Sequence, residues 1–302
     1  MRPYEFCNLS QALIRSEDTL EEIEGKVRVA AIIGTIQSAM VDFKDIDMRF
    51  AKNCKEERLL GVSLSGIMDN PITAGASSDI LERLKGAAIE ENEKWAKKLR
   101  IKPSVSVTCV KPDGNTSVLY NTAPGIHGRY APFYIRRMRV AANTPVANYA
   151  LSVGVPAEPA LGETWEDVRT IVLSFPVKSP EGAVIQRERT AIEQLDNWLV
   201  YKKHFTETNP SVTITYRPEE LPAISVWLFE NQEYAVGLSF LPADDHTYVQ
   251  APYEEVTEAE YERLSATFPQ ITEEGFWNFE NGFVDTTEAA QNLACVGGAC
   301  LM

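Results

Sequence analysis

The chain has 302 residues, a formal net charge of -14 at neutral pH and a hydrophobic fraction of 44%. These values are typical of a globular protein and exclude an intrinsically disordered one. The negative charge argues against a nucleic-acid polymer as partner, because neutralising many phosphates needs a surplus of Lys and Arg. A single nucleotide in a local pocket remains compatible with it. No segment approaches the roughly 20 apolar residues of a membrane span, so we expect a cytoplasmic protein without a membrane partner.

Alternating and helical patterns predict an α/β fold. Apolar residues at helical spacing predict three helices, the first of them capped by Ser16: their stripes are Leu20, Ile23 and Val27; Leu81, Leu84 and Ala88; and Ile192, Leu195 and Leu199. Alternation of apolar with small polar residues predicts five strands, at 60–65, 104–109, 171–175, 211–215 and 236–240. Strands that alternate with helices predict a mainly parallel sheet with helices packed on it.

The second face of these strands is rich in Ser, Thr and Gly. Such a face either lines a narrow barrel interior that holds a polar ligand or meets water, and the pattern leaves both open. After Pro242 the sequence turns acidic and irregular.

Residues 111–117, Lys-Pro-Asp-Gly-Asn-Thr-Ser, directly follow the second predicted strand. A turn rich in Gly and hydroxyl groups at the start of a helix offers free backbone amides to a phosphate, although it is also common as a plain turn. His127 follows between two glycines, where a structural hydrogen bond is the simpler role. The cluster of Arg136, Arg137 and Arg139 is either a salt-bridged face or a complement to ligand charge.

Five cysteines are scattered along the chain, at positions 7, 54, 109, 295 and 300. An odd, scattered set is not a secreted disulfide framework, so a disulfide here is expected to cycle. Cys54 and Cys109 lie in apolar or strand contexts and are predicted to be core residues. Cys295 and Cys300 flank Val-Gly-Gly-Ala, which predicts a mobile dithiol. A frayed tail with incidental cysteines and half of a metal site are the alternatives, and no metal site is predicted elsewhere.

Seven separate segments carry a resemblance to a known family: 6–10 (Phe-Cys-Asn-Leu-Ser), 54–66, 111–114 (Lys-Pro-Asp-Gly), 125–137, 175–182, 209–214 and 245–255. Together they resemble the adenosylcobalamin-dependent, monomeric class II ribonucleotide reductases over essentially the whole chain. The resemblance implies the C-terminal half of a ten-stranded α/β barrel, with five mainly parallel strands and packed helices. It places this half-barrel in residues 1–245, an irregular acidic subdomain in 246–290 and a flexible redox tail in 291–302.

The resemblance also implies site residues. Cys7 matches one of the two cysteines that reduce the substrate ribose, and Cys295 and Cys300 match the tail pair that restores them. The substrate phosphate loop is matched by Gly114, Asn115, Thr116 and Ser117. In the family this loop usually reads Lys-Pro-Glu-Gly-Thr, an apolar residue and Ser, so Asp113, Asn115 and Thr116 depart from it. His127 is a candidate for support of the active site.

The function implied is the reduction of ribonucleoside triphosphates to 2′-deoxyribonucleotides by thiyl-radical chemistry, with adenosylcobalamin as cofactor and a thioredoxin-like reductant. The family's Asn-x-Cys-x-Glu motif, which carries the radical cysteine, and the partner cysteine of Cys7 do not occur in the sequence. We therefore expect an N-terminal half of the reductase as partner. Two other functions remain open, namely a non-catalytic remnant that binds a nucleotide or a partner protein, and a dithiol carrier that needs Cys295 and Cys300 but not the phosphate turn.

Overall fold

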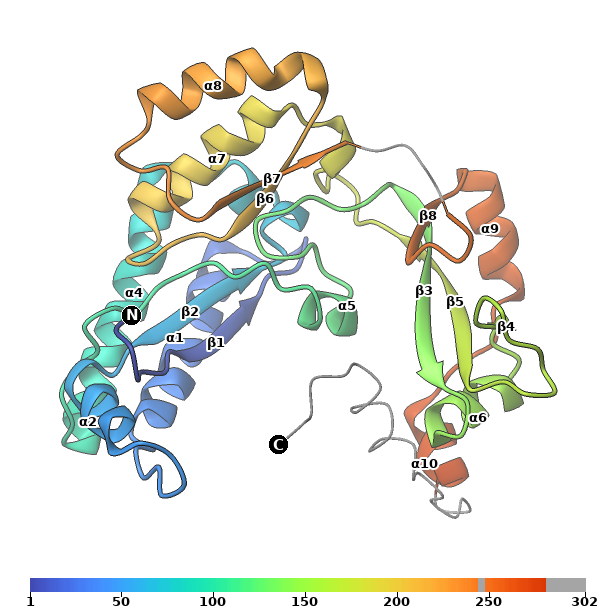
Figure 1. The fold of residues 1–302 in the computed structure, drawn as a ribbon, viewed down its shortest axis with the longest axis horizontal. Coiled ribbons are helices and arrows are strands. Elements are labelled where there is room, and N and C mark those ends of the chain that lie inside the picture. The colour runs from blue at the N-terminus through green and yellow to red at the C-terminus, as the bar shows by residue number, and fades with distance from the viewer. Residues whose placement is uncertain (244–247, 281–302) are drawn as a thin grey trace. The chain divides into compact units, whose positions relative to one another are not determined.

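The computed structural model describes residues 1–243 and 248–280. The chain divides into two compact units, the first formed by 1–129 and 179–244, the second by 130–178 and 245–302. The sequence-based division at residue 245 did not anticipate that 130–178 leave the first unit. Figure 1 shows both units as ribbons.

Unit 1 contains a row of parallel strands. β1 (Asn8–Leu13) pairs in parallel with β2 (Leu60–Ser65), and β6 (Val212–Tyr216) pairs in parallel with β7 (Leu238–Pro242). Residues 107–110 join the two pairs through parallel bridges, from Thr108 to Val62 and from Val110 to Pro210. The spatial order is therefore β1, β2, 107–110, β6 and β7. The described residues do not close this row into a barrel.

Three findings differ from our strand predictions. The predicted strand at 104–109 forms only isolated parallel bridges, at Thr108 and Val110. β1 had no predicted counterpart, although it forms one edge of the row. The predicted strand at 171–175 does exist, within β5 (Thr170–Lys178), but it belongs to an antiparallel sheet in unit 2. Alternation alone identifies a strand and carries no information about its neighbour.

The rest of unit 1 consists mainly of helices. Their bounds, with the 3-10 turns, are α1 Leu20–Ser38, α2 Met48–Glu57, η1 Ile67–Asp69, α3 Pro71–Ala74, α4 Ser78–Leu99, α5 Thr116–Tyr120, η2 Gln186–Glu188, α7 Ala191–His204, η3 Pro218–Glu220 and α8 Leu221–Glu230. The three predicted helices are confirmed as α1, α4 and α7. The cap of α1 is Thr19 and not Ser16, because Thr19 and Glu22 form a reciprocal capping box. α1 packs on α4 and on both β1 and β2 (Figure 1).

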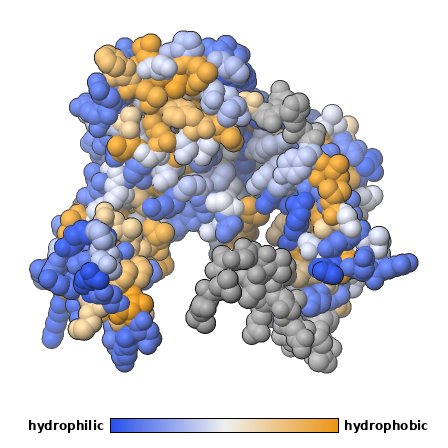
Figure 2. All heavy atoms as spheres, viewed as in Figure 1, coloured by the Kyte–Doolittle hydropathy of each residue, from blue (hydrophilic) through white to orange (hydrophobic). Residues whose placement is uncertain are grey.

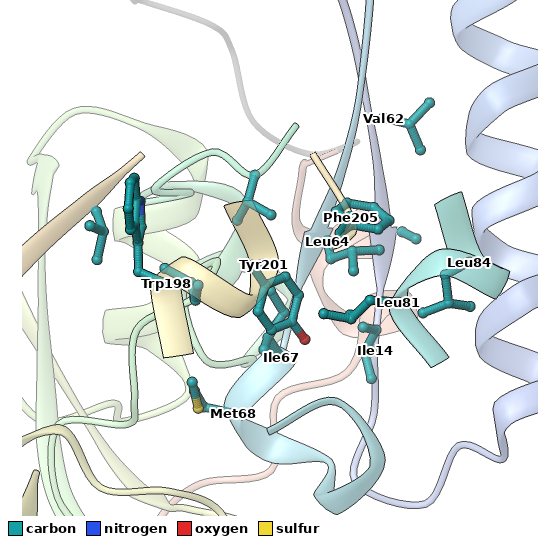
Figure 3. Close-up of a cluster of buried hydrophobic side chains, with 14 of the residues drawn as sticks. Ile14, Val62, Leu64, Ile67, Met68, Leu81, Leu84, Trp198, Tyr201 and Phe205 are labelled. Carbon is teal, nitrogen blue, oxygen red and sulfur yellow. The ribbon is translucent and has the colours of Figure 1, made fainter. Parts of the chain in front are cut away.

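The core of unit 1 lies between the strands and these helices (Figure 3). Leu64 of β2, Leu81 and Leu84 of α4 and Phe205 are fully buried there. Trp198 of α7 is also buried, and its indole Nε1 donates to the carbonyl oxygen of Pro210 at 2.6 Å. Burying a large apolar side chain contributes on the order of 1.5–3 kcal/mol, so this cluster accounts for much of the stability of the unit.

Unit 2 is built on a four-stranded antiparallel sheet in the order β4, β5, β3, β8. Its elements are β3 Phe133–Ala141, α6 Pro145–Ser152, β4 Ala157–Pro159, β5 Thr170–Lys178, β8 Tyr253–Glu255, α9 Glu258–Thr267 and α10 Glu273–Glu280. A small apolar cluster around Ala147, Ile171 and Leu173 packs α6 on the sheet. After Pro242, where we expected irregular structure, the described residues 248–280 form β8, α9 and α10, and the expectation is corrected for these residues.

Apolar side chains gather on the surface over α8, as Figure 2 shows. Leu221, Val226 and Phe229 of this helix are 46%, 58% and 74% exposed. Within the described residues, β7 pairs only with β6 and β1 only with β2, so both ends of the strand row are open edges. Open edges and exposed apolar faces are features that proteins normally cover. Among the described helices, none is long and apolar enough to cross a membrane.

Candidate active site

Cys7 lies directly before β1 and is a half-buried free thiol. The backbone on both sides of it is fixed. The Phe6 amide donates to the sulfur of Cys54 at 3.4 Å, and the Phe6 ring stacks on Phe50 with 4.7 Å between centroids. On the other side, the Asn8 amide donates to the Leu59 carbonyl oxygen at 2.8 Å. The Cys7 side chain is therefore held at the start of the edge strand.

Cys7 and Cys109 meet over Gly61, which lies in β2 between them. A Cβ atom added to Gly61 would lie 3.2 Å from the Cys7 sulfur and 3.0 Å from the Cys109 sulfur. Glycine costs stability inside a strand, and here it leaves the space that both thiols occupy. Two strand spacings of about 4.8 Å separate the backbones of Cys7 and Cys109, beyond the roughly 7 Å that a disulfide spans. They are neighbouring thiols that this strand order keeps from joining.

The two thiols differ in their readiness to ionise. Burial raises the pKa of Cys109 to about 12, and Cys109 is 1% exposed, in agreement with its predicted core role. Burial also raises the pKa of Cys7, and the nearby positive charge of Lys111 opposes this effect at both cysteines. Cys7, being half-buried, is the thiol that solvent and other molecules can reach.

Hydroxyl groups on the polar face of β2 hold the loop that begins at Lys111. The Lys111 amide donates to Ser63 Oγ at 2.9 Å. Ser65 Oγ donates to the Asp113 carboxylate and also lies 3.1 Å from the Ala123 carbonyl oxygen. Ser63 and Ser65 are buried at 2% and 0% exposure. At these two positions the small, hydroxylated strand face therefore binds protein backbone and side chains and does not meet water.

The predicted phosphate residues lie at the start of α5. Asp113 adopts a positive φ of 56°, which turns the chain into the helix. Gly114 and Asn115 are exposed, and their amides donate to no other group of the described chain. Ser117 is 3% exposed, and its Oγ donates to the Asp113 carbonyl oxygen at 2.5 Å. The exposed amides suit an anion, whereas the Ser117 hydroxyl stabilises the turn.

A buried ion pair anchors the segment that follows α5. Asp69 Oδ1 accepts from Arg129 Nε at 2.7 Å, and Asp69 Oδ2 accepts from Arg129 Nη2 at 2.8 Å and from the Ala123 amide at 2.8 Å. Arg129 Nη1 donates to Asn121 Oδ1 at 2.7 Å. Asp69 and Arg129 are 2% and 3% exposed. Sequence reasoning missed this pair, because 60 residues separate its members and no local pattern links them.

His127 has hydrogen bonds at both ring nitrogens. Nδ1 lies 3.0 Å from the Pro124 carbonyl oxygen, and Nε2 accepts from the Thr213 amide at 3.0 Å. This arrangement requires the neutral ring with its proton on Nδ1. Burial accordingly lowers the pKa of His127. The ring joins the segment after α5 to β6, which is a structural role.

Comparison with known proteins adds a relationship to this geometry. No protein-family model matches the chain. It is 27% identical to a probable adenosylcobalamin-dependent ribonucleoside-triphosphate reductase of Dictyostelium discoideum, over 90% of this chain and 36% of that protein. It is 26% identical to the adenosylcobalamin-dependent ribonucleoside-triphosphate reductase of Euglena gracilis, over 98% of this chain and 40% of that protein. The chain is homologous to these reductases.

The fold of this reductase homologue agrees with that relationship. A crystal structure of a B-12 dependent (class II) ribonucleotide reductase superposes with a TM-score of 0.79, covering 94% of this chain and 43% of the other at 20% identity. This likeness shows a shared α/β fold. The chain spans about two fifths of the length of the relatives it matches.

Two groups of predicted residues remain. Cys295 and Cys300 are outside the residues that the structure describes. The arginine cluster lies on β3 of unit 2, where Arg136 stacks over the Tyr253 ring at 4.3 Å and Arg137 pairs with Glu254. In the described part of the chain, no group of three or more His, Cys, Asp or Glu side chains could hold a metal ion.

Proposed function

We propose that this chain is the C-terminal part of an adenosylcobalamin-dependent ribonucleotide reductase that converts ribonucleoside triphosphates to 2′-deoxyribonucleotides. The observation that carries the proposal is the placement of Cys7. It lies at the rim of a parallel strand row, on the same polar face as the loop that holds Gly114 and Asn115. A reducing thiol on the same strand face as a phosphate-binding turn is what the reduction of a nucleotide ribose requires.

In this proposal Cys7 and a cysteine of the N-terminal half supply two electrons and two protons as they form a disulfide. The 2′-hydroxyl of the substrate leaves as water. Amides at the start of α5 bind the substrate phosphates, and the contacts of Ser63, Ser65 and Asp69 hold that loop in place. Cys295 and Cys300 then reduce the disulfide by exchange, and a thioredoxin-like reductant restores them.

The cofactor comes to the proposal from the relatives, which are adenosylcobalamin-dependent. When bound, it supplies the radical that starts the reaction. The described residues assemble no side-chain set that identifies a corrinoid site: both His127 nitrogens are already hydrogen-bonded. We therefore assign no residue to the cofactor and derive no step through it.

The partner is an N-terminal half of the reductase, on the same or on a separate polypeptide. The chain covers about two fifths of its relatives, and both ends of its strand row are open edges among the described residues. Together with the apolar surface over α8, these edges offer places where a second half-barrel docks. On its own, we expect this chain to aggregate or to be partly ordered. A monodisperse monomer with a cooperative thermal transition would contradict that expectation.

The deciding experiment measures deoxyribonucleotide formation from a ribonucleoside triphosphate with adenosylcobalamin and a dithiol. This chain is assayed alone and with an N-terminal half that carries the Asn-x-Cys-x-Glu motif. We expect activity only in the mixture, its loss in Cys7→Ser and its retention in the matched control Cys109→Ser. If the two halves bind each other and remain inactive, the chain is a non-catalytic remnant and the proposal is wrong.

A second experiment addresses the tail. Replacement of Cys295 or Cys300 with Ser should abolish turnover with a protein reductant and spare a single turnover of the prereduced enzyme. Loss of the single turnover as well would refute the relay role. Normal turnover in both variants would remove the tail from the mechanism.

A further inference from the structure

Lys111 lies near the two thiols. Its side chain has no role in the proposed phosphate binding or in the proposed reduction of the ribose. It follows Cys109 by two residues, and alternate residues of an extended segment share one face. Its main chain is fixed, because its amide donates to the buried Ser63 hydroxyl at 2.9 Å. The Lys111 side chain therefore leaves the strand row on the face where Cys7 and Cys109 meet over Gly61.

Lys111 is the charged residue with the largest effect on Cys7. The charged groups that act on Cys7 are Lys111, Glu5 and the amino group of Met1, and the Cys109 thiol lies next to it across Gly61. Of the charged groups, Lys111 has the largest effect on both thiols. Within the described parts of the chain, the Lys111 ammonium makes no ion pair with a carboxylate. Its charge is therefore available to a neighbouring anion.

We propose that Lys111 is a positioning residue whose ammonium stabilises the thiolate form of Cys7 in preference to Cys109. The selection between the two thiols comes from burial. Cys109 is 1% exposed and keeps its proton, while half-buried Cys7 can become charged and still contact solvent. Thiolates, not thiols, are the nucleophiles and leaving groups of disulfide exchange.

This inference deepens the proposed function and, for its role in turnover, rests on it. When the disulfide of Cys7 is reduced, an attacking thiolate forms a bond to the partner sulfur. The bond to Cys7 breaks, and Cys7 leaves as a thiolate that carries the electron pair and later takes a proton from water. A leaving thiolate that is stabilised leaves faster. Lys111 thus accelerates the reduction of the disulfide without contact with the substrate ribose.

The test uses this chain, bound to the N-terminal half wherever it does not fold alone, and needs no reductase activity. The alkylation of each cysteine by iodoacetamide is followed by peptide mass spectrometry between pH 6 and 10. In the native chain we expect Cys7 to react and Cys109 to stay protected. Lys111→Met should slow the alkylation of Cys7 about threefold to tenfold at neutral pH and move the midpoint of its pH dependence upward. The reason is that a nearby positive charge lowers the pKa of a thiol by about one.

Two matched variants separate charge from structure. Lys111→Arg keeps the charge and should restore the Cys7 rate, whereas Lys102→Met removes an exposed lysine before the same strand and should leave it unchanged. Urea unfolding of each variant confirms that it is folded. If Cys7 in folded Lys111→Met is alkylated at the native rate and with the native pH dependence, the inference is overturned. This holds even if the variant binds a triphosphate more weakly, a result that would make Lys111 a phosphate contact. Because the readout is alkylation, a failed reductase assay does not decide it.

Discussion

The ion pair between Asp69 and Arg129 gives the most quantitative prediction. Asp69→Ala leaves the Arg129 guanidinium charged, buried and without its carboxylate, and it also leaves the Ala123 amide without an acceptor. Removing one partner of a buried pair costs about 3–5 kcal/mol. An orphaned buried amide adds about 1–3 kcal/mol. We therefore expect the free energy of unfolding of unit 1 to fall by at least about 4 kcal/mol, a large part of the 5–15 kcal/mol of a typical domain.

The assay is urea unfolding followed by tryptophan fluorescence, with the buried Trp198 of unit 1 as a reporter. For an m-value of about 2 kcal/mol per M, the midpoint should fall by about 2 M. The control is Arg49→Met, which breaks an exposed ion pair with Asp47 and should not shift the midpoint measurably.

A double variant tests the cause. Asp69→Ala combined with Arg129→Met removes both charges and should cost less than the sum of the two single variants, because the interaction between Asp69 and Arg129 is lost only once. If Asp69→Ala moves the midpoint no further than Arg49→Met does, the ion pair does not hold the segment after α5 in place. Asp69 then has no part in fixing the proposed phosphate loop.

Three further predictions concern the same unit. Gly125 has a φ of +54°, and an added Cβ would lie 2.2 Å from the Lys111 carbonyl oxygen. Gly125→Ala should therefore lower the melting temperature by several degrees. In the control Gly86→Ala, within α4, the added Cβ has nothing within 4 Å and the melting temperature should rise slightly. Gly61→Ala should cost about 1–3 kcal/mol in urea unfolding, because the added methyl group would lie 2.5 Å from Leu9 Cδ2 and 3.0 and 3.2 Å from the sulfurs of Cys109 and Cys7. An unchanged midpoint would show that these side chains can move apart freely. Burial lowers the pKa of His127 in the folded state, while in the unfolded state it keeps the ordinary histidine pKa of about 6.5. As the pH drops from about 7 to 5, the unfolded state therefore binds more protons than the folded state, and the free energy of unfolding should fall. His127→Gln should flatten that dependence, and an equally steep fall in the variant would assign it to other groups.

Much of the fold followed from local patterns. The helices α1, α4 and α7 were predicted from apolar stripes, and β2, β6 and β7 from alternation, because both periods arise within a single element. Local patterns did not predict which neighbour a strand pairs with. The strand at 171–175 has the same alternation as β2 but pairs antiparallel with β3. β1 carries polar residues that alternate weakly, and it is a strand because β2 lies beside it.

The candidate site shows the same division. The sequence by itself determined which residue types are present: a cysteine before a strand, a Gly-rich turn after another, and a family resemblance that the relatives confirm. Only the tertiary structure decided that Cys7, Gly61, Cys109 and Lys111 share one face, and that the serines of β2 hold the loop after Lys111. The physical reason is distance along the chain. Contacts between residues some fifty positions apart depend on how strands order themselves, and that order is set by the packing of the whole core and not by any local pattern.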